Sequence, residues 1–293
     1  MKILDILNQA KKDNKLIEAE ILLSDFLKKD KSFLISHSEF EIPSDILRKF
    51  KKVFKKILNG YPIAYILKKK EFFGREFYVD ERVLIPRPET ECLIEEIMNR
   101  DMPHIPIHIF DVGTGSGCIG ITLALEFLRQ RILKKDLQVI LSDINKDALE
   151  VARINAVRFE IEEICEIVKA DLLDFNGQLI HQSFNKNKCG KNFNIIVANL
   201  PYIGKLNNNF IQENVRKYEP SEALFSGNDG LDLYRKFLDQ VATLKPDICA
   251  FEFGDGQKNE FEDLIKEKLS NYEYKFYKDL AGLWRVVIIR KLM

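Results

Sequence analysis

The chain has 293 residues, so a large domain accompanied by a smaller one is expected. Its 46% hydrophobic and 31% charged residues exclude the disordered and fibrous classes of protein. Lysine plus arginine and aspartate plus glutamate both number 45, so the formal net charge is zero, and the chain lacks the broad positive field of sequence-blind nucleic-acid binders.

Cysteine usage and the apolar pattern indicate a compartment. The five cysteines are scattered with no C-x-x-C pair, which argues against a disulfide framework and a zinc site and fits a reducing cytosol. The N-terminus carries acids and lysines before any long apolar core, so no signal peptide is expected. No apolar run approaches the ~20 residues of a membrane span. We expect a cytoplasmic protein with no membrane contact and no bound metal.

The first 70 residues predict a small helical domain. Apolar residues recur at spacings of three and four across residues 3–27, with lysines between them. Ser44 or Asp45 is expected to cap a further helix that runs to Leu58 and ends at Asn59-Gly60. The lysine-rich faces are typical of solvated surface, and a binding role is the alternative.

An aromatic stretch follows the helical region. Aromatic residues recur from Phe72 to Val79 around Gly74, which indicates a β-hairpin. A stiff segment comes next, in which Arg87 and Pro88 form either a plain linker or a wall that aligns a substrate. Thr90 is then expected to open a helix.

The strongest local signal is a strand, a glycine-rich turn, a helix, a second strand and an acid. The strand is predicted at 107–112, the helix at 118–128, and the second strand ends at Asp143. Glycines let the backbone approach a ligand, and a carboxylate accepts both ribose hydroxyl protons, so this order is typical of a nucleotide-binding βαβ unit. A doubly wound protein without a nucleotide is the alternative, and the incomplete dinucleotide fingerprint disfavours a dehydrogenase. The turn residues are Gly113, Thr114, Gly115, Ser116 and Gly117.

A third strand, predicted at 165–168, ends close to two further candidate residues. An acid at this edge can reach the rim of a bound purine, so Asp171 is a candidate partner of the adenine amine and Leu172 a candidate packing partner of the ring. Asp171 as a helix cap is the alternative. Residues 176–194 are rich in Asn, Lys and Gly without periodicity and predict a surface loop.

The rest of the chain continues the α/β pattern. Helices are predicted at 234–244 and 261–269, and strands at 248–253, 272–277 and 284–289. A tight strand pair after a series of βα units indicates an antiparallel strand at the sheet edge.

One strand end stands out because it stops in polar and rigid residues. The apolar strand 195–198 leads into Asn199-Leu200-Pro201-Tyr202. Pro201 fixes its own φ and biases Leu200 away from the helical region, so the turn is extended. The Asn199 carboxamide and the Leu200 carbonyl are then two acceptors that suit a primary amide or an exocyclic amine. An ordinary strand end with a turn is the alternative.

With these motifs in this order, the sequence resembles the class I S-adenosylmethionine-dependent methyltransferases, specifically the protein-(glutamine-N5) methyltransferases of peptide chain release factors. The resemblance implies a Rossmann-like α/β fold with a seven-stranded sheet whose last strand is antiparallel. It also implies an N-terminal helical domain (1–70) that docks the release factor, a hairpin linker (71–90) and a methyltransferase domain (91–293). The motifs that carry it are LIPRPETE (84–91), DVGTGSG (111–117), Asp143, NLPY (199–202), YEP (218–220), GNDG (227–230) and DLAG (279–282).

The resemblance also implies a site. S-adenosylmethionine is expected on the glycine turn and Asp143, with Asp171, Leu172 and Asn199 completing its pocket. The glutamine of a Gly-Gly-Gln loop is expected against the NLPY residues, Arg87 and Pro88, with Asn199, Leu200, Pro201 and Tyr202 catalytic and Tyr202 packed against substrate or adenine. The expected partner is a release factor, with no direct nucleic-acid contact, and the protein is expected to be a monomer.

Leu200 departs from the family pattern, which has proline there. Asn-Leu-Pro-Tyr resembles the version in ribosomal RNA adenine dimethyltransferases, so an rRNA or DNA adenine-N6 methyltransferase is an alternative. A non-catalytic S-adenosylmethionine-binding assembly factor is another. Leucine supplies a backbone carbonyl as well as proline does, and the neutral charge and flanking motifs favour the protein substrate.

Overall fold

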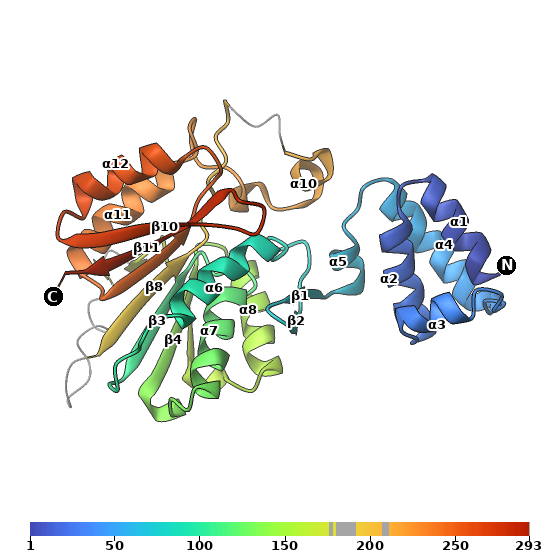
Figure 1. Cartoon of the computed structure of the whole chain (residues 1–293), viewed down its shortest axis with the longest axis horizontal. Helices are drawn as coiled ribbons and strands as arrows, with labels where there is room; N and C mark the ends of the chain where they lie inside the picture. The colour runs from blue at the N-terminus through green and yellow to red at the C-terminus, as the bar shows by residue number, and fades with distance from the viewer. Residues whose placement is uncertain (176–177, 180–191, 207–210, 293) are drawn as a thin grey trace. The chain divides into compact units, whose positions relative to one another are not determined.

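The structure is a computed structural model that describes residues 1–175, 178–179, 192–206 and 211–292 (Figure 1). The chain divides into two compact units. The first comprises Met1–Lys69 and Gln212–Tyr218, and the second comprises Lys70–Ile211 and Glu219–Met293. The stretch 71–90, expected as a linker, lies within the second unit.

The first unit is helical, as predicted. Alternating apolar residues give each helix a buried stripe, and the stripes meet in one core that includes Ile6, Leu22, Leu23, Phe50 and Phe54. The cap expected for the fourth helix is wrong, because Ser44 is already the first helical residue. The N-cap is Pro43, whose side chain has no hydrogen-bonding group. The helices are α1 (Ile3–Lys12), α2 (Leu16–Leu27), α3 (Lys31–Ser36), α4 (Ser44–Leu58) and α5 (Ile63–Leu67).

A short helix from far along the chain completes the first unit. The helix α10 (Glu213–Tyr218) was not predicted from the sequence. The Tyr218 hydroxyl donates to the Asn59 carbonyl at 3.1 Å, and its ring meets Tyr61 edge-on with centroids 5.1 Å apart. Gly60 has a φ of +85° after α4, and a Cβ there would lie 3.3 Å from Asn214 Cβ, so the turn and α10 are closely packed.

The second unit is built on a seven-stranded sheet in the order β10-β11-β9-β8-β3-β4-β5. The predicted α/β fold and its seven strands are confirmed. The last strand, β11, is antiparallel to both neighbours, as expected from the resemblance, but it lies one position in from the edge, which β10 forms. The strands are β3 (Ile107–Val112), β4 (Leu137–Asp143), β5 (Cys165–Lys169), β8 (Phe193–Ala198), β9 (Ile248–Glu252), β10 (Tyr272–Lys278) and β11 (Trp284–Lys291).

Helices cover both faces of this sheet (Figure 1). Side chains alternate along β3, so Ile107 and Ile109 join one core while Phe110 and Val112 join the other. The first core also holds apolar residues of α6 (Glu91–Met98), α7 (Cys118–Arg129) and α8 (Lys146–Arg158). The second holds those of α11 (Asp232–Leu244) and α12 (Lys258–Lys268). The strands and the helices α7, α11 and α12 match the predicted segments to within a few residues.

Smaller elements complete the second unit. The predicted hairpin is present, and both of its turn residues, Phe73 and Gly74, have positive φ, which fits the tight turn of a two-residue loop. Most of the loop predicted at 176–194 lies outside the described residues. The elements are β1 (Lys70–Phe72), β2 (Arg75–Phe77), β6 (Asp174–Phe175) and β7 (Gln178–Leu179), with short helices η1 (Pro88–Thr90), η2 (Lys134–Asp136), η3 (Glu162–Ile164) and η4 (Ser221–Ala223).

The sheet order brings the predicted functional residues to one edge. The strands β5, β4, β3, β8 and β9 are parallel, so their carboxyl ends lie on the same side. The chain order reverses between β3 and β8, and ligands bind at such a switch point in open α/β sheets. The glycine turn follows β3, and the NLPY residues follow β8. In the described residues, no helix is long and apolar enough to cross a membrane.

Candidate functional site

A cavity of about 160 Å³ opens at this edge of the sheet. Its walls come from the LIPRPETE segment, the glycine turn and the ends of β4, β5 and β8. Of the residues predicted for the site, Gly117, Pro88 and Tyr202 do not line it. Those that do are Gly113, Thr114, Gly115, Ser116, Asp143, Asp171, Leu172, Asn199, Leu200, Pro201 and Arg87.

A buried carboxylate bonds both to the glycine turn and to the start of α7. Asp111 accepts hydrogen bonds from the Gly120 N–H at 2.9 Å and from the Thr114 hydroxyl at 2.6 Å. Burial raises the pKa of Asp111 to about 6. Gly113 has a φ of +68°, and a Cβ there would lie 2.9 Å from the Leu200 side chain. The turn therefore depends on glycine both for its conformation and for its contact with the NLPY segment.

Asp143 lies where a ribose-binding acid is expected. Its two carboxylate oxygens accept from the Gly115 N–H at 3.0 Å and the Asn145 N–H at 2.9 Å, which fixes the side chain against the glycine turn. Burial raises the pKa of Asp143. Each oxygen has a second lone pair, so the carboxylate can accept from a ligand hydroxyl while keeping these bonds.

The two residues proposed for the adenine lie beyond β5. Asp171 is exposed and forms an ion pair with Lys236 at 2.5 Å, so its carboxylate is not free of partners. Leu172 is 8% exposed and has a φ of +59°. Their roles toward adenine remain predictions.

The LIPRPETE segment is clamped by the YEP motif. The buried carboxylate of Glu219 accepts from the Ile85 N–H at 3.1 Å and from Arg87 Nη2 at 2.6 Å. Arg87 lines the cavity, whereas Pro88 begins η1 and does not. This geometry favours a wall of the site over a plain linker.

The end of β8 places two polar groups at the cavity. The Asn199 side-chain nitrogen donates to Thr90 Oγ1 at 3.2 Å. The Leu200 N–H donates to the Tyr234 hydroxyl at 3.2 Å, and Tyr234 in turn donates to the Glu252 carbonyl. Both residues of the predicted acceptor pair are therefore held by partners outside their own motif.

Glu252 links these partners, and sequence reasoning missed it. Its carboxylate is buried and accepts from the Thr90 hydroxyl at 2.5 Å and from the Tyr202 hydroxyl at 3.0 Å. Burial raises the pKa of Glu252, while those hydroxyls and the charge of Arg285 favour its ionised form. The available signal was an acid near the end of the apolar strand ICAFE (248–252). Thr90 was predicted only to open a helix.

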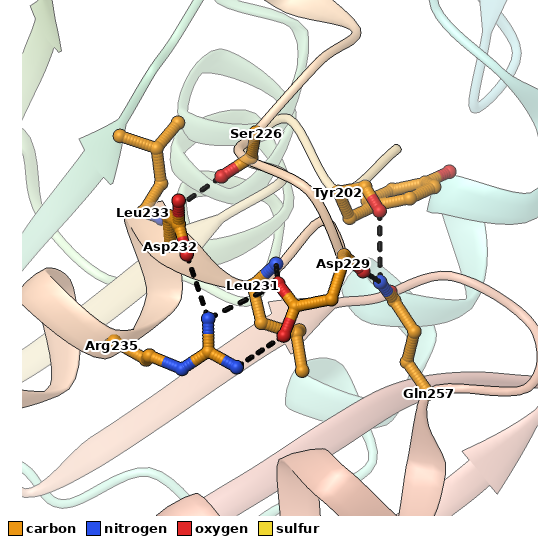
Figure 2. A network of polar contacts seen from close by, with 8 residues as sticks. All are labelled: Tyr202, Ser226, Asp229, Leu231, Asp232, Leu233, Arg235 and Gln257. Carbon is orange, nitrogen blue, oxygen red and sulfur yellow. Dashed lines mark hydrogen bonds and ion pairs between the residues drawn. The ribbon is translucent and has the colours of Figure 1, made fainter. Parts of the chain in front are cut away.

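A second network supports Tyr202 from the GNDG loop (Figure 2). Gln257 Nε2 donates to the carbonyls of Tyr202 at 2.9 Å and Asp229 at 3.0 Å. The Asp229 carboxylate accepts from the Leu231 N–H at 3.0 Å and pairs with Arg235. Gln257 thus joins the NLPY backbone to the loop. The expected packing of the Tyr202 ring on a ligand remains a prediction.

The DLAG motif has a comparable local role. The Asp279 carboxylate accepts from the Ala281 and Leu283 N–H groups at 3.0 Å, and from Arg285 Nε at 3.2 Å. It closes the turn before β11 and fixes Arg285, whose charge acts on Glu252. Within the described residues, no group of three or more His, Cys, Asp or Glu side chains is arranged to hold a metal ion.

Family models and sequence relatives match both units of the chain. The family described as "PrmC N-terminal domain" matches residues 2–67, and the family described as "Methyltransferase domain" matches residues 106–228. The release factor glutamine methyltransferase of Bacillus anthracis is 34% identical over 92% of this chain and 90% of its own length. That of Clostridium acetobutylicum is 34% identical over 98% of this chain and 95% of its own length.

A solved structure shows the fold alone. The N-terminal domain of human METTL16, solved in complex with SAH, superposes with a TM-score of 0.51 at 14% identity, covering 82% of this chain and 84% of that one. The sequence relatives, by contrast, extend across both units. The chain belongs to the release factor glutamine methyltransferase family.

Proposed function

We propose that this protein transfers a methyl group from S-adenosylmethionine to the side-chain amide nitrogen of the glutamine in the Gly-Gly-Gln motif of a peptide chain release factor. One observation supports it most: Asn199 and Leu200, the two predicted acceptors, line the same cavity as the glycine turn and Asp143. A methyl donor and an amide therefore have adjacent places in one site.

The residues present fit S-adenosylmethionine. The glycine turn offers close backbone approach to its methionine portion, and Asp143 offers free lone pairs to its ribose. When bound, this molecule supplies an electrophilic methyl group on a sulfonium. Arg87 and Leu84 extend the cavity wall, and the family resemblance implies that Arg87 contacts the substrate.

The chain's own contribution is to orient a weak nucleophile. An amide nitrogen reacts poorly because its lone pair is delocalised into the carbonyl. Asn199 Oδ1 and the Leu200 carbonyl accept its two N–H groups, which turns the nitrogen lone pair toward the donor methyl. Alignment of this kind supplies up to ~7–11 kcal/mol in the best intramolecular cases. No strong base is needed, since the methylated nitrogen carries a positive charge and its extra proton, now acidic, is lost to solvent, while the donor would leave as the neutral thioether.

The cellular setting is part of this proposal. Release factors act in translation, so we propose that the protein works in the cytoplasm. We further propose that it is a monomer and, given its zero formal net charge, that it binds its substrate through protein contacts and not through nucleic acid. The helical first unit is proposed to dock the release factor, since none of its residues lines the cavity and it contains the match to the PrmC N-terminal domain.

The test is methyl transfer with labelled S-adenosylmethionine. Incubation with a release factor should label one glutamine, found by mass spectrometry of the tryptic peptides. An N199A variant should still bind S-adenosylmethionine but lose transfer, because alanine removes one acceptor, and a release factor with that glutamine replaced should take no label.

Other outcomes would support other functions. Leu200 is the residue that favours the adenine alternative, because NLPY resembles the adenine dimethyltransferase motif. Label found only on RNA or DNA would establish that alternative. Binding of S-adenosylmethionine with no transfer to any translation component would instead indicate an assembly factor.

A further inference from the structure

We propose that Thr90 and Glu252 are positioning residues that fix which end of the Asn199 carboxamide faces the cavity. The inference rests on the proposed function, since it concerns how Asn199 is prepared to accept an amide N–H. Neither residue is assigned a bond to the substrate. Each acts through hydrogen bonds already present in the protein.

The orientation of an asparagine side chain is a chemical problem. Its carbonyl and amino ends have nearly the same shape, so only hydrogen bonding determines which end points where. For Asn199 the choice decides activity, because an amino group facing a substrate N–H would present donor to donor. The site therefore needs a hydrogen-bonding partner that keeps the amino end of Asn199 from facing the substrate, an orientation called flipped below.

Glu252 fixes the direction of the first hydrogen bond, the one from Thr90. Ionised, a carboxylate only accepts hydrogen bonds, and Glu252 is 1% exposed with its oxygens 2.5 Å from Thr90 Oγ1 and 3.0 Å from the Tyr202 hydroxyl. The hydroxyl hydrogen of Thr90 is therefore committed to Glu252. Burial raises the pKa of Glu252, and the hydrogen bonds from Thr90 and Tyr202 together with the charge of Arg285 oppose that rise and favour the ionised state.

Thr90 in turn determines the orientation of Asn199. Once its single hydrogen points at Glu252, its oxygen has only lone pairs to offer, so the Asn199 side chain, 3.2 Å away, must turn its amino end toward it. The carbonyl end of Asn199 then points away from Thr90. Carboxylate, hydroxyl and carboxamide form a relay in which one acceptor-only group determines the direction of every bond.

A purely structural account of these residues fits less well. In the described structure Thr90 precedes α6 but forms no side-chain capping bond there, so its hydroxyl is not used to begin the helix. The buried carboxylate of Glu252 is costly to maintain. The nearby Arg285 does not offset this cost with a hydrogen bond among the described residues, since its bond, at 3.2 Å, goes to Asp279. The backbone carbonyl of Glu252 also holds Tyr234, which accepts the Leu200 N–H, so one residue supports both proposed acceptors.

The experiment compares variants of the full chain for turnover, for KM toward the release factor and for S-adenosylmethionine affinity. In E252Q the amide can donate to Thr90, which frees the Thr90 hydrogen to face Asn199 and favours the flipped arrangement. We expect kcat to fall about 10- to 100-fold, with cofactor affinity and KM within about threefold, because a transition-state contact is lost.

Thr90 allows a sharper comparison. T90V removes the hydroxyl at nearly constant shape and should lose kcat by a similar factor, whereas T90S keeps the hydroxyl and should retain most of it. T122V is the matched control: Thr122 is fully buried, and its hydroxyl has no partner among the described residues. It should turn over as the wild type does. Unfolding midpoints show that each variant is folded.

The outcomes separate the two proposals. If the wild type fails to methylate a release factor, the proposed function fails. If it succeeds and T90V retains full kcat, or T90S falls as far as T90V, the relay is wrong. Should E252Q not fold, the T90V and T90S pair still decides the matter.

An activity-independent measurement covers the case of an inactive wild type. The side-chain amide signal of Asn199, identified by its loss in N199D, should exchange slowly in the wild type and in T90S, and faster in T90V. Equal exchange in T90S and T90V would overturn the relay.

Discussion

Position 200 shows how one residue meets two requirements. Its carbonyl is the proposed acceptor for the substrate, while its N–H donates to Tyr234 at 3.2 Å and its side chain, 3% exposed, contacts Gly113. Proline, the usual family residue, supplies the carbonyl but has no N–H to donate. The leucine therefore adds a bond and a packed side chain without removing the proposed acceptor.

We predict that L200P retains methyl transfer to within about fivefold, because the carbonyl remains, and loses about 1–3 kcal/mol of unfolding free energy through the lost bond and packing. Denaturant unfolding and labelled-methyl assays measure the two effects. L200A, which keeps the N–H and shortens the side chain, is the control that isolates packing. Loss of transfer in L200P with full stability would contradict the backbone role.

Asp111 predicts a pH effect on stability. Its pKa rises from 3.8 to about 6 on burial, so the folded protein holds this proton more tightly than the unfolded chain does. Its stabilising contribution is complete below about pH 4 and is lost as the pH rises toward 6. The size is up to about 3 kcal/mol, from ~1.4 kcal/mol for each pKa unit.

The variant D111N tests this. An asparagine oxygen can accept the same two bonds from Thr114 and Gly120, and its amino group occupies the place of Oδ1, which has no partner among the described residues. Relative to the wild type, D111N should gain stability as the pH rises from 4 to 6 in urea unfolding. Parallel curves for the two proteins would show that the buried carboxyl does not titrate there.

At the scale of elements, the GNDG loop and the NLPY segment are in very close contact. Gly230 has a φ of +90°, and a Cβ there would lie 2.1 Å from the Tyr202 carbonyl oxygen. No side chain fits between the two backbones. The loop thus supports the segment that carries the proposed acceptors, together with the bonds of Gln257 (Figure 2).

We predict that G230A displaces Tyr202 and lowers methyl transfer about tenfold or more, since misplacement near 1 Å can cost 100-fold. G74A is the matched control, because Gly74 also has positive φ, +69°, yet a Cβ there has no neighbour within 4 Å. Backbone strain should lower the unfolding free energy of both variants by about 1–3 kcal/mol, but only G230A should lower the rate of methyl transfer. Equal transfer rates would contradict the supporting role of the loop.

Elements whose signals are local were predicted from the sequence, and those made by distant contacts were not. The βαβ unit carries its own periodicity and glycine turn, so β3, α7 and β4 emerged close to their true bounds. The helix α10 is six residues long and polar, and what holds it is Asn59 and Tyr61, far back in the chain. The role of Glu252 could not be predicted from the sequence because its partner Thr90 is 162 residues away.

At the scale of the whole molecule, the two units have separate cores. The buried residues of the first unit form one cluster, and those of the sheet form two others. The cavity is lined entirely by residues of the second unit. Chemistry and proposed docking are therefore assigned to different units, and removing one should leave the other's task intact.

We predict that a 70–293 fragment binds S-adenosylmethionine as the full chain does, but shows KM toward the intact release factor raised at least about tenfold, as expected when binding contacts are removed without change in the reacting site. Calorimetry measures the first quantity and methyl-transfer kinetics the second.

A short Gly-Gly-Gln peptide is the control substrate. It is too small to contact a docking unit, so the fragment and the full chain should methylate it equally. A fragment that modifies the intact release factor as efficiently as the full chain would remove docking from the first unit. One that loses cofactor binding as well would show that the second unit needs the first, or the contacts of α10 with Asn59 and Tyr61, in order to fold.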